Sequence, residues 1–292
     1  MFEAFERVRV EASDAEINLV RGGEGPPVLL LHGYPQTHSM WHSVAPRLAE
    51  NFTVVATDLR GYGDSSKPFG SEDHATYSKR AMAADQVQVM ESLGFLSFAV
   101  VGHDRGGRVG HRMALDHPDR VTRLAVLDIV PTRHVYATVG RELATAYYHW
   151  FFFIQPYDLP ETLIGADPGY YLRKKLGGWG TKLDTFAPEA LAEYERCFGD
   201  PATIHASCED YRAAASIDLA HDDADRDEGR KFTCPLLALW GDRGAMGRLY
   251  DVANVWREYA RDVRGGPIDA GHFLAEERPE ETARELANFL QG

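Results

Sequence analysis

The most constraining feature of the chain is a glycine-flanked polar segment that follows a short apolar run, Val101-Gly102-His103-Asp104-Arg105-Gly106-Gly107. This pattern is typical of a nucleophile elbow, a strained strand-to-helix turn that carries its central side chain into a pocket. The central residue of such elbows is commonly serine, but here it is Asp104. A carboxylate displaces a leaving group from an sp3 carbon and forms an ester that water must cleave. Asp104 therefore predicts a hydrolase of carbon–halogen or epoxide bonds rather than an esterase.

Length and composition bound the possible classes of protein. The chain has 292 residues, 44% hydrophobic and 26% charged, so it can bury a large core as one domain with an insertion or as two domains. Its net charge of −13 argues against nucleic acid or an anionic membrane as partner. Residues 1–11 lack a signal-peptide core and no apolar stretch reaches membrane-spanning length, so we expect a soluble, intracellular protein. Cys197, Cys208 and Cys234 lack metal-ligand spacing, which indicates reduced thiols and no metal site.

Short apolar runs alternate with helical patterns, which is typical of a mostly parallel sheet wrapped by helices. An opening hairpin is expected at Val8–Val10 and Ile17–Val20, and further strands at Val28–Leu31, Thr53–Thr57, Phe98–Val101, Leu124–Leu127, Leu236–Trp240 and Val263–Ile268. Helices are expected at Trp41–Leu48, Tyr77–Leu93, Arg108–His117 and Glu280–Leu290. The predicted fold class is α/β, with an eight-stranded sheet flanked by helices.

The alternation breaks once, between residues 132 and 230. This stretch is helical and aromatic, with no convincing buried strand before Cys234-Pro235-Leu236. Its place in the chain predicts a helical lid over the carboxyl ends of the strands, where open α/β folds bind ligands. We therefore predict a core domain of residues 1–131 and 231–292 and a lid insertion of residues 132–230.

A histidine follows the last predicted strand, in Asp269-Ala270-Gly271-His272-Phe273. A loop histidine that comes after the nucleophile and an acid in chain order fits the general base of a nucleophile–acid–histidine set. Two acids compete to orient His272, because Asp128 and Asp242 each end a predicted strand. Either position can reach the base.

The segment Leu31-His32-Gly33-Tyr34-Pro35 follows the third strand and is expected to complete the site. The backbone N–H groups of Tyr34 and Arg105 can together form an oxyanion hole.

Two arginines follow the nucleophile, and both can project into its cavity. Unpaired buried guanidinium groups are costly, so Arg105 and Arg108 imply a resident anion, and a planar carboxylate matches their geometry. The alternative is that each arginine forms a structural salt bridge with a carboxylate of the lid or core. The aromatic run of residues 147–153 adds His149 and Trp150 as N–H donors, although an aromatic lid helix would look the same.

Taken together, these residues resemble the fluoroacetate (haloacetate) dehalogenases of the α/β-hydrolase superfamily over the whole chain. The resemblance rests on His32-Gly33-Tyr34-Pro35, Gly102-His103-Asp104-Arg105-Gly106-Gly107-Arg108, Asp128-Ile129-Val130-Pro131-Thr132, Tyr148-His149-Trp150-Phe151 and Gly271-His272-Phe273. It implies that Arg105 and Arg108 bind a haloacetate carboxylate and that His149, Trp150 and Tyr211 bind the departing halide. The superfamily at large favours Asp242 as the acid, but the closer resemblance favours Asp128, which we prefer. The resemblance to the dehalogenases further implies a cytoplasmic homodimer that needs no metal or organic cofactor.

Two other functions stay open from the sequence. An epoxide hydrolase uses the same Asp–His pair with lid tyrosines, for which Tyr147, Tyr148 and Tyr211 are candidates, but a neutral epoxide leaves both arginines without an anion. A ligand receptor on a hydrolase scaffold has no need of a complete set of Asp104, Asp128 and His272.

Overall fold

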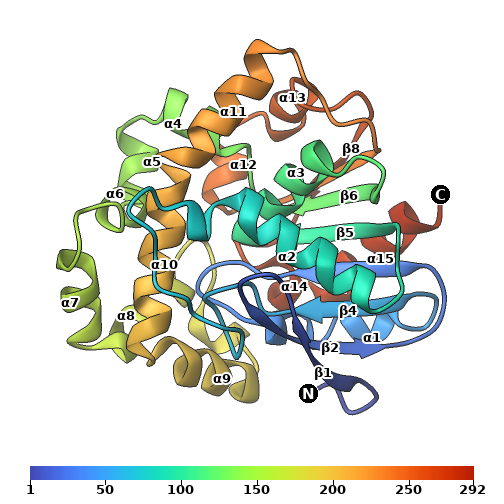
Figure 1. The fold of residues 1–292 in the computed structure, drawn as a ribbon, viewed down its shortest axis with the longest axis horizontal. Coiled ribbons are helices and arrows are strands. Elements are labelled where there is room, and N and C mark those ends of the chain that lie inside the picture. Colours follow the sequence, from blue (N-terminus) through green and yellow to red (C-terminus); the bar gives the residue numbers. More distant parts are fainter.

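The structure is a computed structural model that describes all 292 residues. Its centre is one eight-stranded sheet in the order β1-β2-β4-β3-β5-β6-β7-β8 (Figure 1). The strands are β1 (Glu6–Glu11), β2 (Glu16–Gly22), β3 (Pro27–Leu31), β4 (Thr53–Thr57), β5 (Phe98–His103), β6 (Val121–Leu127), β7 (Leu236–Gly241) and β8 (Val263–Ile268). The first two pairings are antiparallel and the five others are parallel. The predicted fold class and all eight predicted strands are present.

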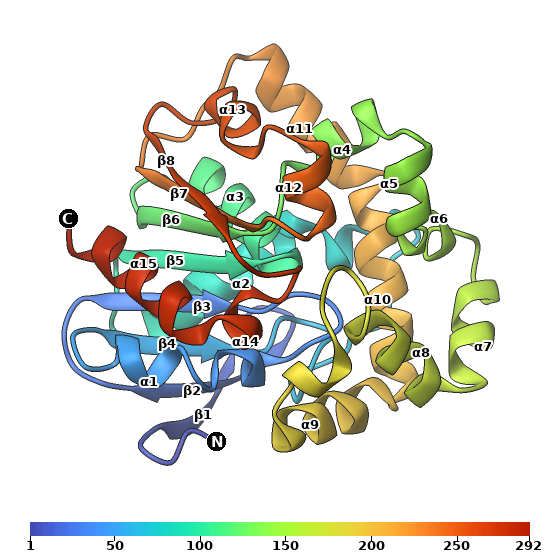
Figure 2. The same ribbon diagram turned by 180° about the vertical axis from the view of Figure 1, so that it is seen from behind.

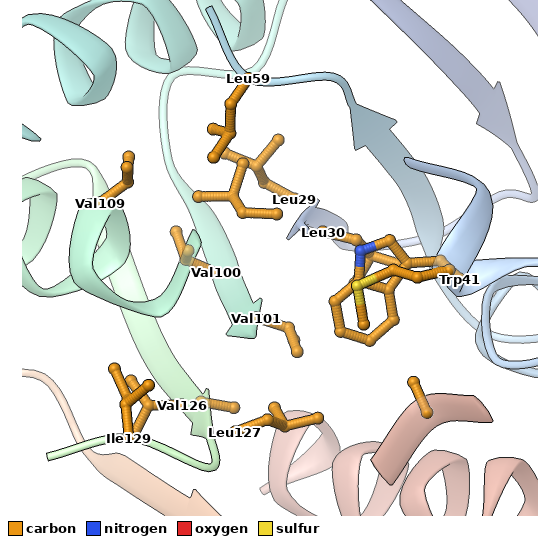
Figure 3. Close-up of a cluster of buried hydrophobic side chains, with 14 of the residues drawn as sticks. Leu29, Leu30, Trp41, Leu59, Val100, Val101, Val109, Val126, Leu127 and Ile129 are labelled. Carbon is orange, nitrogen blue, oxygen red and sulfur yellow. The ribbon is translucent and has the colours of Figure 1, made fainter. Parts of the chain in front are cut away.

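The inner strands form because they are apolar along their whole length. Every residue of β4 and β5 is buried, as expected for parallel strands that are covered on both faces. Figure 3 shows the resulting core, in which Val100 and Val101 of β5 lie between the leucines of β3 and Val126 and Leu127 of β6. This close packing holds the carboxyl end of β5, and with it the predicted elbow, in a fixed position.

Helices cover both faces of the sheet. In Figure 1, α2 and α3 lie on the near face, whereas Figure 2 shows α1, α14 and α15 on the opposite face. The helices of the core are η1 (His38–Trp41), α1 (Ala45–Leu48), η2 (Ala75–Tyr77), α2 (Lys79–Ser92), α3 (Arg105–Asp116), α12 (Ala245–Leu249), α13 (Val252–Arg257), α14 (Leu274–Glu277) and α15 (Pro279–Gln291).

Two predicted helices differ from the observed ones. The expected helix at residues 41–48 is divided into η1 and α1, because Pro46 is tolerated only in the first turn of a helix. Helix α3 begins at Arg105 rather than at Arg108, so the helix follows the elbow directly and carries both arginines in its first turn.

Between β6 and β7 the chain forms helices and no strand. The segment contains α4 (Thr132–Thr138), α5 (Arg141–Ala146), α6 (His149–Phe152), α7 (Leu159–Gly165), α8 (Pro168–Leu176), η3 (Leu183–Thr185), α9 (Pro188–Phe198), α10 (Pro201–Ala214) and α11 (Ile217–Asp227). Most of these helices gather at one end of the sheet (Figures 1 and 2). The division into a core and a lid domain stays a prediction. None of the helices in the molecule has the length and apolar character needed to cross a bilayer.

Candidate active site

Asp104 occupies the turn between β5 and α3 with φ 45° and ψ −112°. A positive φ is strained for any residue with a Cβ and marks candidate functional sites. The turn is also crowded: a Cβ on Gly102 would lie 2.5 Å from the Gly107 nitrogen, and one on Gly106 would lie 2.5 Å from the His32 carbonyl oxygen. The glycines of the motif are therefore required for the backbone to turn here.

The Asp104 carboxylate faces backbone donors. The Tyr34 N–H donates to its Oδ1 at 3.0 Å, and Arg105 is the first residue of α3, where amide groups lack an intrahelical acceptor. Burial alone raises the pKa of Asp104, but the positive charges of His272, Arg108 and Arg105 outweigh burial and bring the pKa below its ordinary value. Asp104 is therefore ionised at neutral pH, as a nucleophile must be.

His272 and Asp128 form a buried hydrogen-bonded pair. The His272 Nδ1 lies 2.6 Å from Asp128 Oδ2, and the Gly241 N–H holds the other carboxylate oxygen at 3.0 Å. Burial lowers the pKa of His272, but its hydrogen bond to Asp128 and the charges of Asp128 and Asp104 raise the pKa above the ordinary value. Asp242 is exposed and makes no side-chain hydrogen bond to His272. The geometry thus favours Asp128 as the acid.

The two arginines of α3 are not equivalent. Arg105 is fully buried and binds Asp210 of α10 in a two-pronged pair, with Nε to Oδ2 at 2.9 Å and Nη2 to Oδ1 at 2.7 Å. Its Nη1 has no partner. The salt bridge that was the alternative for both arginines is therefore present for Arg105, which keeps only one free nitrogen for a ligand.

Arg108 has no carboxylate partner in the structure. Its Nη1 donates to the Val130 carbonyl and the Thr132 hydroxyl, both at 3.0 Å, while Nε and Nη2 are buried without an acceptor. Burial and the charge of Arg105 lower the pKa of Arg108, although Asp104 acts in the opposite direction. Two unpartnered N–H donors on one buried guanidinium mark the place where an anion would be most strongly stabilised.

The three predicted halide donors lie around the same arginines. The Arg108 guanidinium carbon lies 4.6 Å from the ring centroid of Trp150, and that of Arg105 lies 4.2 Å from the ring of Tyr211. The Trp150 Nε1 is buried without an acceptor, and His149 Nε2 lies 3.1 Å from the Tyr211 hydroxyl. Burial holds the pKa of His149 far below its ordinary value, so its ring is neutral.

The tyrosines considered for epoxide chemistry separate into two groups. The Tyr147 hydroxyl is buried without a partner and the Tyr211 hydroxyl contacts His149, so both lie in the site. Tyr148 is 47% exposed, and its ring centroid lies 3.6 Å from the Lys175 Nζ rather than near the arginines. Tyr148 is therefore not part of the site.

Sequence reasoning missed two residues that shape the site. Asp210 has no sequence motif of its own, yet it binds Arg105 and accepts a hydrogen bond from Tyr62 at 2.7 Å. Trp179 accepts the His272 N–H on its carbonyl at 3.0 Å, and its ring lies 5.1 Å from the His272 ring. The only sequence signal for Trp179 is its position among glycines.

Comparison with known proteins places the chain among enzymes. A family model described as "alpha/beta hydrolase fold" matches residues 26–279. Fluoroacetate dehalogenase of Burkholderia sp. is 52% identical over 99% of this chain and 95% of its own length. Soluble epoxide hydrolase of Corynebacterium sp. (strain C12) is 37% identical over 90% of each chain. The crystal structure of a Nostoc sp. PCC 7120 protein, described only as an α/β-hydrolase, is 62% identical with a TM-score of 0.98 and 99% coverage of both chains.

Proposed function

The chain belongs to the α/β-hydrolase family and is related within it to fluoroacetate dehalogenase, and we propose that it hydrolyses haloacetates to glycolate and halide. The observation that carries the proposal is the buried Arg108 guanidinium, whose Nε and Nη2 have no acceptor beside the Asp104 nucleophile. A substrate carboxylate would satisfy both donors, and a neutral substrate would leave them unsatisfied.

In the first step, Arg108 and the free Nη1 of Arg105 bind the substrate carboxylate. An Asp104 oxygen then attacks the substrate Cα, forming a C–O bond while the carbon–halogen bond breaks and the halide leaves with the bonding electrons. Because the arginines fix the carboxylate, the displacement becomes a positioned, effectively unimolecular step. Trp150 and the His149–Tyr211 pair would donate hydrogen bonds to the departing halide, which matters most for fluoride because its charge is concentrated.

In the second step, His272 removes a proton from water, and the resulting hydroxide attacks the carboxyl carbon of the Asp104 ester. Asp128 holds the imidazole in the required tautomer and stabilises the imidazolium that forms. The backbone N–H groups of Tyr34 and Arg105 stabilise the oxyanion. Collapse of the intermediate releases glycolate and restores the Asp104 carboxylate, and the proton taken up by His272 passes to solvent.

We further propose that residues 132–230 act as a lid that excludes water from this site. Asp210 and Tyr211 belong to α10 of this segment, and Asp210 joins it to the core through Arg105. A cytoplasmic homodimer remains the assembly that the family resemblance implies.

Epoxide hydrolysis is the second candidate, favoured by the 37% identical epoxide hydrolase and by the buried, unpartnered hydroxyl of Tyr147. The same Asp104 and His272 would serve, with Tyr147 and Tyr211 donating to the epoxide oxygen. This reaction offers no ligand to Arg108, which is why we rank it second.

One assay separates the two functions. The purified protein is incubated with fluoroacetate under a fluoride electrode, and in parallel with chloroacetate and with a neutral terminal epoxide. We expect halide release from both haloacetates and none in the Asp104→Asn variant. Diol formation from the epoxide without halide release would refute the proposal and establish the second candidate.

A further inference from the structure

A cavity lies between α8 and the segment that follows β7, and Trp179 links its lining to the candidate active site. It has a volume of about 720 Å³, and its lining includes Lys174, Lys175, Arg243 and Arg248 but no aspartate or glutamate. This is unusual in a chain whose net charge is −13. A concave surface lined by one sign of charge focuses the electrostatic field and raises the local concentration of the opposite ion.

Lys175 is the exceptional cation in this cavity. Lys175 is only 4% exposed, and no carboxylate lies within salt-bridge distance of its ammonium group. Arg243 and Arg248, by contrast, contact Glu277 at 3.2 Å and Glu142 at 3.8 Å. Burial lowers the pKa of Lys175 to about 7, which is the expected cost of an ammonium group without a counter-ion.

Aromatic rings cover part of the ammonium group. The Lys175 Nζ lies 3.6 Å from the ring centroid of Tyr148, 5.4 Å from that of Tyr171 and 5.3 Å from that of Trp179. Cation–π contacts of this kind compensate some of the lost hydration. Aromatic rings are weaker acceptors than an anion, and the Lys175 ammonium group has no carboxylate partner where it lines the cavity. A small anion in the cavity would accept hydrogen bonds from this ammonium group.

Trp179 separates this cavity from the candidate active site. Its ring lines the cavity and also lies 4.9 Å from the His149 ring and 5.1 Å from the His272 ring. Its indole N–H donates to the Ala146 carbonyl at 3.1 Å, which fixes the ring in place. The backbone of Trp179 has φ 53°, a conformation that is strained for a bulky residue and is found at functional positions. The Trp179 ring would therefore lie between an anion beside Lys175 and the predicted halide donor His149.

We propose that Lys175 forms a second binding site for small monoanions, outside the reaction site, which receives haloacetate before it enters and halide after it leaves. The identity of these anions rests on the proposed function, whereas the existence of the site rests on the Lys175 geometry. The site would raise the local concentration of substrate against the negative field of the whole protein. Lys175 would act on binding and release, and not on the bond-breaking step.

Bromide is the probe for this site, since it is a monoanion that can be located by its anomalous scattering in soaked crystals. We expect an anomalous bromide peak beside Lys175 in the wild type and no such peak in Lys175→Met. The Lys175→Arg variant, which keeps the positive charge, should again bind bromide there. The matched control is Lys182→Met, because Lys182 is an exposed lysine in the loop that follows α8 and does not line this cavity. Bromide should remain beside Lys175 in this control.

Kinetics provide the second readout. In Lys175→Met we expect kcat/KM for chloroacetate to fall by about tenfold through a raised KM. The single-turnover rate of ester formation at saturating chloroacetate should be unchanged, and Lys182→Met should match the wild type. If Lys175→Met fails to fold, Lys175→Gln takes its place.

The outcomes distinguish this inference from the proposed function. Normal turnover with no bromide at Lys175 overturns the second site alone. A bromide peak that persists in Lys175→Met is an adventitious ion only and also overturns it. Bromide at Lys175 in a protein that releases no halide from haloacetates supports the site and refutes the proposed function. A slowed single-turnover rate in Lys175→Met would place Lys175 in the chemical step and contradict the inference.

Discussion

Replacing each arginine of α3 by methionine should show that Arg105 stabilises the fold in addition to contacting the ligand, whereas Arg108 serves the ligand alone. Arg105→Met removes the partner of Asp210, whose carboxylate is fully buried. Breaking a buried ion pair from one side typically costs about 3–5 kcal/mol. Because Asp210 keeps its contacts with Lys79 and Tyr62, we expect a loss near the lower limit, about 3 kcal/mol in the free energy of unfolding.

Arg108→Met should change the free energy of unfolding little but lower the activity strongly. The change removes a buried guanidinium with two unpartnered nitrogens and leaves only the Val130 carbonyl and the Thr132 hydroxyl without a donor. Relief of the buried charge offsets the lost hydrogen bonds, so we expect a stability change below about 1 kcal/mol. Loss of one arm of a desolvated charge pair costs about 2–5 kcal/mol, so kcat/KM for chloroacetate should fall by about 30-fold to 5000-fold.

Urea unfolding without substrate and initial rates with chloroacetate and chloroacetamide measure both effects. The amide is the control, since its neutral group should make it a poor substrate for the wild type and insensitive to Arg108→Met. Equal stability of the two variants would refute the structural role of Arg105. A wild-type kcat/KM in Arg108→Met would remove the observation on which the proposed function rests.

Three further predictions concern the two chemical steps. In His272→Asn, alkylation should proceed without hydrolysis, so intact-mass analysis after fluoroacetate treatment should find an ester on Asp104, and undiminished turnover would contradict the assigned base. Asp128→Asn should slow ester hydrolysis far more than Asp242→Asn. A base acts when deprotonated, and Asp128 raises the pKa of His272, so the wild-type rate should fall with decreasing pH around a value above the ordinary 6.5. In Asp128→Asn this fall in rate should occur at lower pH. Trp150→Phe should lower kcat for fluoroacetate by about 10²–10³-fold and for chloroacetate much less, whereas an equal loss on both would mean that Trp150 only packs the helix.

The fold class and the positions of most candidate site residues could be predicted from local sequence patterns. Short apolar runs alternating with helical patterns favour buried parallel strands, so the inner strands β3 to β7 could be placed from the sequence, and alternating residues indicated the opening hairpin of β1 and β2. The elbow at Asp104 was equally readable, because its glycines are demanded by local backbone geometry and crowding rather than by distant contacts. The family match and the related dehalogenase then confirmed the predicted fold and resemblance.

Which buried charges pair with one another became visible only in the three-dimensional structure. From the residues alone both Asp128 and Asp242 could reach His272, and only the family resemblance favoured Asp128. The 2.6 Å contact to Asp128 depends on how the ends of β6 and β8 lie in space. The sequence also provided no reason to distinguish Arg105 from Arg108. In the structure Asp210, more than a hundred residues away in α10, binds Arg105 and leaves Arg108 without a carboxylate partner. Periodicity and turn motifs report local conformation, but the pairing of buried charges is set by long-range packing, where a shift of a few ångströms decides between a salt bridge and an unsatisfied cation.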